Sequence, residues 1–214
     1  MSDDTIQPGF FRFFRALFYG FCRLMFRLEV HGAEHIPASG GCLMASNHAS
    51  YMDPPLVGSA IRHRAVRFMA RGTLFRFKPF GWFLRKMGTV PIDRDRGDLS
   101  ALRKGVRLLK SGRLLCLFPE GTRTMDGRLQ EAKGGIGLLI AKASVPVIPV
   151  YIDGSYRAFP RGAILIRPKK VNVYYGKPIM PDELPELRDG KPDYARIGQL
   201  VMSRIAALKP PQPR

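Results

Sequence analysis

Two short apolar runs constrain the fold of this chain more than any other feature. The run Cys42–Ala45 leads into a polar stretch, and Pro54 and Pro55 follow. Apolar residues followed by polar ones and then by Pro at a helix start are typical of a buried strand that turns into a helix. The run 114–118 is apolar throughout, as expected for a strand covered on both faces. These runs predict an α/β fold, in which functional residues gather at the carboxyl ends of strands.

The stretch 47–53, Asn-His-Ala-Ser-Tyr-Met-Asp, follows the first run and is predicted to be the catalytic centre. His48 titrates closest to neutral pH, so it can take a proton from a hydroxyl group. Asp53 can accept the second N–H of that ring and fix its tautomer. The alternative is structural, with Asp53 capping the helix that follows. The pair provides a base without a nucleophile.

Ser50 raises the rival hypothesis of a serine nucleophile. A nucleophile elbow needs Gly two residues before and after the Ser, and these positions hold His48 and Met52. Ser50 is therefore assigned a supporting role, as a turn former or hydrogen-bond donor. Asn47 is assigned a supporting role as well.

The pattern Asn-His-x-Ser-x-x-Asp resembles the first motif of the glycerolipid acyltransferase family, and in particular of its lysophosphatidic acid acyltransferases. In that family the His is the general base on an acceptor hydroxyl and the Asp orients it. The resemblance assigns these roles to His48 and Asp53. The family has three further motifs, and this chain offers a match to each in the same order.

The second match ends in Gly88–Arg94, Gly-Thr-Val-Pro-Ile-Asp-Arg. In the family's second motif a Gly-led strand carries a closing Arg that helps to hold the phosphate of the acceptor, a task suited to a guanidinium group. The resemblance gives this role to Arg94. The alternative is that Arg94 belongs to a solvated charge cluster with Asp93 and its neighbours. Pro91 departs from the bulky residue that is usual in the family.

The third match, Phe118–Thr124, is the most specific stretch of the chain. Its sequence Phe-Pro-Glu-Gly-Thr-Arg-Thr differs from the family motif only in a final Thr for Ser, which preserves a hydroxyl group. Gly121 lets the backbone approach a ligand closely, while Thr122 and Arg123 supply donors to phosphate oxygens. Glu120 is expected to bind an acceptor hydroxyl or to hold Arg123 in place. A plain strand-end turn is the alternative.

The fourth match is the run Val145–Val150, which is expected to line the acyl or acceptor pocket. Two further strands, 163–166 and 171–175, are predicted to form a hairpin and so to give the sheet an antiparallel portion. The resemblance covers roughly residues 29–176 and implies a mixed, mostly parallel sheet flanked by helices. Beyond the motifs, the apolar spacing predicts a strand at 66–70 and helices at 54–61, 99–112, 133–141 and 193–208.

The charge balance of the chain predicts an anionic partner. Thirty-five Lys and Arg against seventeen Asp and Glu give a net charge of +18, which suits nucleic acid, an anionic membrane surface or a phosphate-bearing substrate. A basic nucleic-acid-binding module gives no reason for the pair His48 and Asp53, so nucleic acid is not the expected partner. Three scattered cysteines without a CxxC pair favour a reducing cytoplasm and indicate no metal site.

The segment from Gly9 to Leu28 is predicted to be an amphipathic helix that lies in a membrane interface. Its arginines exclude a transmembrane span, and it is not a signal peptide. The expected organisation is an interfacial helix at 1–28 and an acyltransferase domain at 29–214, held at the cytoplasmic face of the cell membrane as a peripheral or monotopic protein. The alternative is a first helix packed in the core. The expected apolar face comprises Phe10, Phe14, Leu17, Phe21, Leu24 and Leu28, opposite Arg12, Arg15, Arg23 and Arg27.

The resemblance implies transfer of a fatty acyl group from acyl-CoA or acyl carrier protein to the sn-2 hydroxyl of 1-acyl-sn-glycerol-3-phosphate, a lysophosphatidic acid. The product would be phosphatidic acid, and neither a cofactor nor a metal is expected. Three alternatives stay open: another acceptor, such as glycerol 3-phosphate or a different lysolipid; a hydrolase that uses Ser50; and a basic nucleic-acid-binding module.

Overall fold

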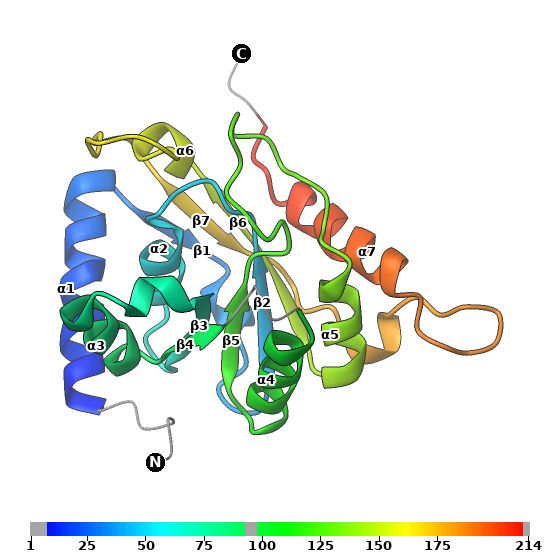
Figure 1. Ribbon diagram of the computed structural model, residues 1–214. Helices are drawn as coiled ribbons and strands as arrows, with labels where there is room; N and C mark the ends of the chain where they lie inside the picture. The colour runs from blue at the N-terminus through cyan, green and yellow to red at the C-terminus, as the bar shows by residue number, and fades with distance from the viewer. Residues whose placement is uncertain (1–7, 93–97, 212–214) are drawn as a thin grey trace.

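The computed structural model describes residues 8–92 and 98–211, and it contains one seven-stranded sheet with helices on both faces (Figure 1). The strands are β1 Glu29–His31, β2 Cys42–Ser46, β3 Val66–Arg71, β4 Thr89–Ile92, β5 Leu114–Leu117, β6 Val147–Asp153 and β7 Asn172–Tyr175. The helices are α1 Pro8–Phe26, α2 Asp53–Ala60, α3 Lys78–Lys86, α4 Asp98–Lys110, α5 Gly135–Ala143, α6 Ser155–Ala158 and α7 Tyr194–Ala207, with short 3-10 turns η1 Ala33–His35, η2 Gly72–Phe75 and η3 Pro181–Glu183.

The sheet is mixed and mostly parallel, as predicted. Its order is β1-β7-β6-β2-β5-β3-β4. The strands from β6 to β4 in that order are all parallel, while β7 is antiparallel to β6 and β1 is parallel to β7. The carboxyl ends of the five parallel strands therefore lie at one edge, where β2 leads into the loop that carries His48.

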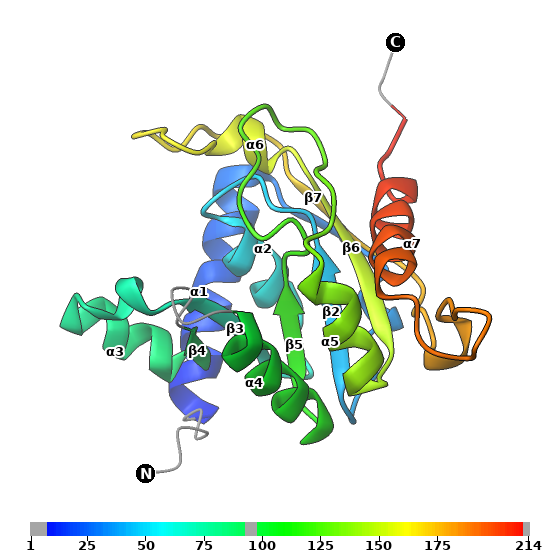
Figure 2. The same cartoon turned by 45° about the vertical axis from the view of Figure 1, so that its right-hand side comes forward.

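The two faces of the sheet are covered by different helices. Residues of β2 alternate between the two hydrophobic clusters: Met44 packs in one with α1 and α2, and Leu43 packs in the other with α4, α5 and α7. A strand whose side chains are buried on both sides must be apolar at every position. Figure 2 shows α4, α5 and α7 in front of the sheet, with α1 and α2 behind it. The continuous apolar run at 42–45 is explained by this arrangement.

The predicted hairpin between residues 163 and 175 is wrong. Residues 163–166 form no strand, and β7 instead pairs antiparallel with β6, which produces the antiparallel portion of the sheet. Ile164–Ile166 have high β-propensity, but they find no neighbouring strand. The N–H of Ala163 donates to Pro160 O in a turn, and the N–H of Arg167 donates to Ala158 O, so the segment closes on itself as a loop.

Helix α1 packs one side against the rest of the protein. Phe11, Cys22 and Phe26 are buried, while Phe10 and Phe14 pack against aromatic side chains of α3. Part of the expected apolar face is left exposed. These residues are Leu17, Phe21 and Leu24, and Phe13, which lies outside the expected face, is exposed as well. We call the four exposed residues Phe13, Leu17, Phe21 and Leu24 the apolar stripe.

The alternative of a core-packed first helix is thus correct for one side of α1, and the other side presents apolar residues to solvent. No helix in the described part of the chain is long and apolar enough to span a membrane. The boundary expected at residue 28 remains a prediction. Phe26 and Leu28 nevertheless lie in the same buried cluster as α2 and β2, so α1 cannot be removed without opening the core.

Candidate active site

The loop that follows β2 is fixed by Asn47 to the neighbouring strand β6. The side-chain Nδ2 of Asn47 donates to Ile152 O at 3.1 Å, and its Oδ1 accepts from the N–H of Ile152 at 2.7 Å. Asn47 is buried, so both of its polar ends are satisfied where water cannot reach them. The residue holds the start of the catalytic stretch at the carboxyl edge of the sheet.

His48 and Asp53 form a hydrogen-bonded pair. Nδ1 of His48 lies 2.8 Å from Oδ2 of Asp53, which is fully buried at the start of α2. The same carboxylate oxygen accepts from the N–H groups of Ala49 and Ser50, each at 2.7 Å. An ionised carboxylate only accepts hydrogen bonds, so Nδ1 of His48 carries the proton and Nε2 is left with its lone pair. The pair is therefore oriented as a general base acting through Nε2.

The turn at Phe118–Thr124 packs directly against His48. The ring of Phe118 stacks on the imidazole at a centroid distance of 3.9 Å, and Oε1 of Glu120 accepts from the N–H of His48 at 3.0 Å. The N–H of Thr124 in turn donates to His48 O at 2.9 Å. The first and third motifs, separated by some seventy residues in sequence, thus form one continuous site.

Glu120 is buried beside Asp53, and its carboxyl group is unusual. The pKa of Glu120 is raised to about 7, mainly by burial; the N–H groups of His48 and Gln130 partly offset this effect, and the charge of Asp53 adds to it. Oε2 of Glu120 is buried without a hydrogen-bond partner among the described residues. A carboxyl group with a pKa near 7 populates both forms at neutral pH, so it can donate to or accept from a ligand hydroxyl group.

Arg123 stacks on the aromatic ring of Tyr51. Its guanidinium carbon lies 3.3 Å from the ring centroid, and its Nη1 is buried without a hydrogen-bond partner in the described part of the chain. The ring of Tyr51 also contacts Phe159, at a centroid distance of 5.8 Å. A stacked guanidinium retains its in-plane donors for an anion.

A second cation lies beside the same turn. Gly121 has a φ of +68°, and a Cβ at this position would lie 2.9 Å from Cγ of Lys133. The N–H of Lys133 donates to Pro119 O at 2.9 Å, which fixes the backbone of this residue against the turn. Gly121 is therefore required both for its backbone conformation and for the close approach of Lys133.

Ser50 is occupied by structural hydrogen bonds. Its hydroxyl donates to Phe159 O at 2.7 Å and accepts from the N–H of Met52 at 3.0 Å, and the residue is fully buried. A nucleophile would have to give its proton to a base and present its oxygen to the substrate. Neither is compatible with these bonds. The geometry matches a turn former that ties the catalytic loop to residue 159.

The structure brings together His48, Asp53, Glu120, Gly121 and Arg123 as the sequence predicted. Thr122, by contrast, is exposed to solvent. Arg94 lies outside the described residues. Three side chains were not predicted as site residues: Tyr51, Phe118 and Lys133. The first two lie within the matched motifs, so the motifs themselves signalled them, whereas the contact of Lys133 depends on how the chain folds after β5.

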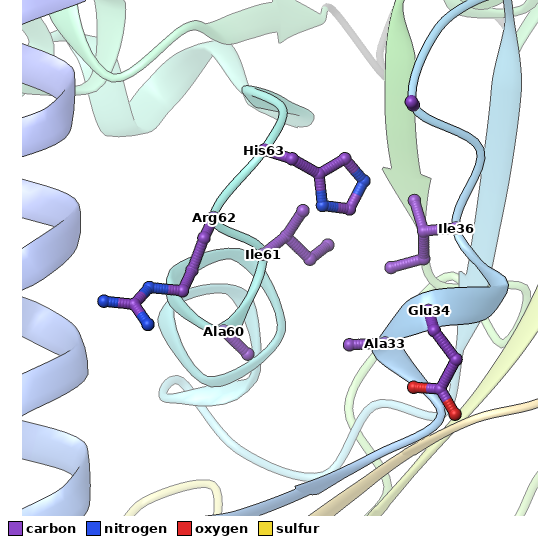
Figure 3. Close-up of a pocket in the computed structure, with 8 residues that line it drawn as sticks. Ala33, Glu34, Ile36, Ala60, Ile61, Arg62 and His63 are labelled. Carbon is purple, nitrogen blue, oxygen red and sulfur yellow. The ribbon is translucent and has the colours of Figure 1, made fainter.

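A surface hollow at the opposite end of α2 is separate from this site. It has a volume of about 380 Å³, and Figure 3 shows residues from η1 on one side and from the end of α2 on the other. Asp53 begins α2 whereas Ala60 ends it and lines the hollow, so the length of the helix separates the two places. In Figure 3 the side chain of Arg62 points toward α1 rather than between these two walls.

The fold and site define an α/β protein with a His–Asp pair beside a turn that bears Arg123 and contacts Lys133. A family model described as Acyltransferase matches residues 27–153. The chain belongs to this acyltransferase family.

Named relatives agree with this assignment. The chain is 32% identical over 158 residues to a chloroplastic 1-acyl-sn-glycerol-3-phosphate acyltransferase of Brassica napus, covering 72% of this chain and 45% of that protein. It is 27% identical to a 1-acyl-sn-glycerol-3-phosphate acyltransferase of Bacillus subtilis, covering 85% of this chain and 88% of that protein. The chain therefore spans less than half the length of the plant relative, but most of the bacterial one.

A solved structure shares the fold. The crystal structure of PlsC, a 1-acyl-sn-glycerophosphate acyltransferase from Thermotoga maritima, superposes with a TM-score of 0.74 at 27% identity. The similarity covers 95% of this chain and 80% of that one.

Proposed function

We propose that this protein transfers a fatty acyl group from a thioester donor to the sn-2 hydroxyl of 1-acyl-sn-glycerol-3-phosphate, which gives phosphatidic acid. The observation that carries the proposal is the contact between the base pair His48–Asp53 and the turn that bears Glu120 and Arg123. A base next to a cationic turn suits an acceptor that has a hydroxyl group and a phosphate close together. The names of the relatives support the same acceptor.

In the proposed mechanism the acceptor hydroxyl is activated by His48. Nε2 takes the hydroxyl proton while the oxygen forms a bond to the thioester carbonyl carbon. The carbon–sulfur bond then breaks, and the imidazolium returns the proton to the departing thiolate. Asp53 keeps its charge throughout and stabilises the imidazolium through the 2.8 Å contact with Nδ1. Acyl transfer is direct, so no acyl-enzyme is formed.

The phosphate of the acceptor is proposed to bind the cations around the turn. Arg123 has a buried Nη1 without a protein partner among the described residues, and Lys133 lies against Gly121. Arg94 joins them in the proposal, on the strength of its place in the second motif. Charge-assisted hydrogen bonds from a guanidinium are strong and directional, so they would hold the sn-2 hydroxyl near Nε2. Glu120 would contact a hydroxyl group of the glycerol backbone.

We further propose that the reaction takes place at the cytoplasmic face of the cell membrane, with the protein bound peripherally or monotopically. The net charge of +18 favours an anionic surface, and the apolar stripe of α1 provides side chains that can enter the interface. A lysolipid acceptor keeps its tail in the bilayer, and extracting that tail into water would cost about 0.8 kcal/mol per CH₂ group. An active site at the surface avoids this cost. Acyl-CoA and acyl carrier protein are both suitable donors.

Glycerol 3-phosphate is the second candidate acceptor, since it carries the same phosphate and hydroxyl groups. The apolar stripe favours a lysolipid, because a water-soluble acceptor gains nothing from membrane attachment. A panel of acceptors with each of the two donors decides between them. We expect the highest kcat/KM with 1-acyl-sn-glycerol-3-phosphate in vesicles, and a clear preference for glycerol 3-phosphate would overturn this choice.

Three variants test the chemistry. His48→Ala should abolish transfer, and Asp53→Asn should lower kcat by roughly 10²–10⁴ without unfolding the protein. Ser50→Ala should keep substantial activity, because its hydroxyl serves the loop rather than the reaction. The control is the thermal unfolding midpoint of each variant. An inactive Ser50→Ala variant, with a labelled acyl group trapped on Ser50 of the wild type, would instead establish a nucleophilic mechanism.

A further inference from the structure

The loop between α6 and β7, residues 159–170, presents an aliphatic tip to solvent. Ile164 is 93% exposed and Leu165 is 76% exposed, and Ile166 next to them is exposed as well. Three consecutive exposed aliphatic side chains are costly in water unless something covers them. Within the protein the loop closes on itself through a hydrogen bond from the N–H of Arg167 to Ala158 O, so the tip projects away from the core.

The same loop is strongly basic. Arg161, Arg167, Lys169 and Lys170 lie on either side of the tip, and the segment 159–170 contains no Asp or Glu. The first three are exposed, while Nζ of Lys170 bonds Glu29 at 2.7 Å. Aliphatic residues at a tip with cations at its base match the cross-section of an anionic bilayer, in which headgroups lie outside and acyl chains inside.

The base of the loop is attached both to the catalytic loop and to α1. Ser50 Oγ donates to Phe159 O at 2.7 Å, and Ser50 forms an isolated β-bridge with Pro160. At the other end, the N–H of Val171 donates to Phe26 O, the last residue of α1, at 2.9 Å. In Figures 1 and 2 the loop, drawn in yellow beyond α6, projects toward the side of the molecule on which α1 lies.

We propose that the 159–170 loop is a second membrane contact, separate from α1, in which Ile164–Ile166 enter the interface of an anionic bilayer. The loop cations then lie among the headgroups. A second contact near the carboxyl end of α1 adds to the contact along the helix and restricts how the protein can tilt on the surface. The stretch around His48, which is bonded to the loop through Ser50, is thereby held against the lipid surface. This inference rests on the proposed function in one respect: the proposed acceptor is a lipid, so that holding the site against a lipid surface is useful.

A fluorescent label tests whether the tip enters lipid. Cys22, Cys42 and Cys116 are buried, and burial raises the pKa of both Cys22 and Cys42 to about 12, so a Leu165→Cys variant is labelled selectively. We expect the emission of an environment-sensitive dye at this position to shift to the blue when vesicles of phosphatidylcholine and phosphatidylglycerol are added. Leu187→Cys is the control, because Leu187 is exposed on a different loop and its dye should not respond. An unchanged spectrum at position 165 overturns the proposal.

A second experiment measures the consequence for binding and activity. Replacing Ile164, Leu165 and Ile166 together by Ser should weaken binding to these vesicles by about tenfold or more, since their apolar area no longer enters the interface. Transfer to a short-chain, water-soluble acceptor should stay unchanged, as should both properties in Leu187→Ser.

Two results would refute the membrane contact. Suppose that the triple Ser variant binds vesicles as the wild type does, but that light scattering shows dimers only for the wild type. The tip would then contact a second copy of the chain. Loss of transfer to the water-soluble acceptor, with vesicle binding intact, would make the loop part of the substrate site. If the wild-type protein acylated no acceptor at all, the proposed function would fail, while the label would still report on the loop.

Discussion

At the scale of single residues, the site depends on side chains that hold other side chains. Asp53 orients His48 with one carboxylate oxygen that also fixes two backbone N–H groups. Tyr51 supports Arg123 in a similar way, because an unstacked guanidinium on a flexible side chain would have to be ordered anew for each substrate. The groups to which we assign catalysis and phosphate binding are thus held in position without a bound acceptor.

Replacing Tyr51 tests this preparation. Tyr51→Leu should raise the KM for the phosphorylated acceptor several-fold, by loss of a stacking interaction of roughly 1 kcal/mol, and should leave the KM for the acyl donor unchanged. Tyr51→Phe keeps the ring and should behave like the wild type. Steady-state kinetics with each substrate varied in turn provide the measurement. Equal changes in both KM values would mean that Tyr51 shapes the whole pocket rather than Arg123.

Glu120 gives the protein a pH-dependent stability. Mainly because of burial, the pKa of Glu120 is raised from 4.5 to about 7 in the folded state. Between these two pH values the carboxyl group is therefore mostly ionised in the unfolded chain and mostly protonated in the folded protein. The contribution of Glu120 to the free energy of unfolding is therefore greatest below pH 4.5, falls as the pH rises to about 7, and is constant above that. Glu120→Gln removes this dependence.

Urea unfolding of both proteins between pH 4.5 and 8 provides the test of Glu120. The Gln variant should gain stability relative to the wild type as the pH rises to about 7, and the difference should then level off. A difference that does not vary with pH would show that Glu120 is ionised in the folded protein throughout the range.

At the scale of elements, α1 has two apolar sides with different tasks. Phe26 is fully buried, whereas Leu24 is 86% exposed. We expect Phe26→Ala to lower the free energy of unfolding by about 3–5 kcal/mol, and Leu24→Ala to change it by less than about 0.5 kcal/mol. Leu24→Ala should instead weaken vesicle binding. Chemical denaturation and vesicle sedimentation of the two variants measure both effects, and the opposite pattern would reverse the two sides of the helix.

The elements show what the sequence can and cannot predict. The α2, β3, α4, β5 and α7 segments were all located from their apolar spacing. That spacing shows that α1 has an apolar side, but not that a second set of residues, Phe11, Cys22 and Phe26, packs in the core of the protein. Residues 163–166 were predicted to be a strand paired with 171–175 because aliphatic side chains favour strands. In the structure both sides of β7 are occupied, by β6 and by β1, so no partner position is left for them.

The candidate site was predicted more completely than the fold around it. Residues within each motif keep their local geometry, so the pairing of His48 with Asp53 followed from a spacing of five positions. The stacking of Phe118 on His48 depends on how β2 and β5 lie side by side, and the approach of Lys133 to Gly121 depends on how the chain folds after β5. No local pattern records such contacts between distant segments.

For the whole molecule, the net charge of +18 should govern the approach to membranes while apolar contacts sustain binding. Binding to vesicles that contain phosphatidylglycerol should weaken as NaCl is raised from about 0.1 M to about 1 M, because the Debye length falls from about 10 Å to about 3 Å. A residual affinity should persist at high salt. Sedimentation with vesicles over this range of NaCl concentrations measures both the salt-dependent and the residual binding. Pure phosphatidylcholine vesicles are the uncharged control. Complete loss of binding would leave no role for the apolar stripe.

The position of β1 in the sheet delays its pairing while the chain is being synthesised. Glu29 of β1 pairs with Asn172 of β7, so β1 enters the sheet only after β7 has been synthesised. At a synthesis rate of roughly 5–20 residues per second, this interval is on the order of ten seconds. Throughout that time α1 is already synthesised, while β1 has no partner strand. Under the proposed membrane role of α1, we expect attachment of the nascent chain to begin before the sheet is complete.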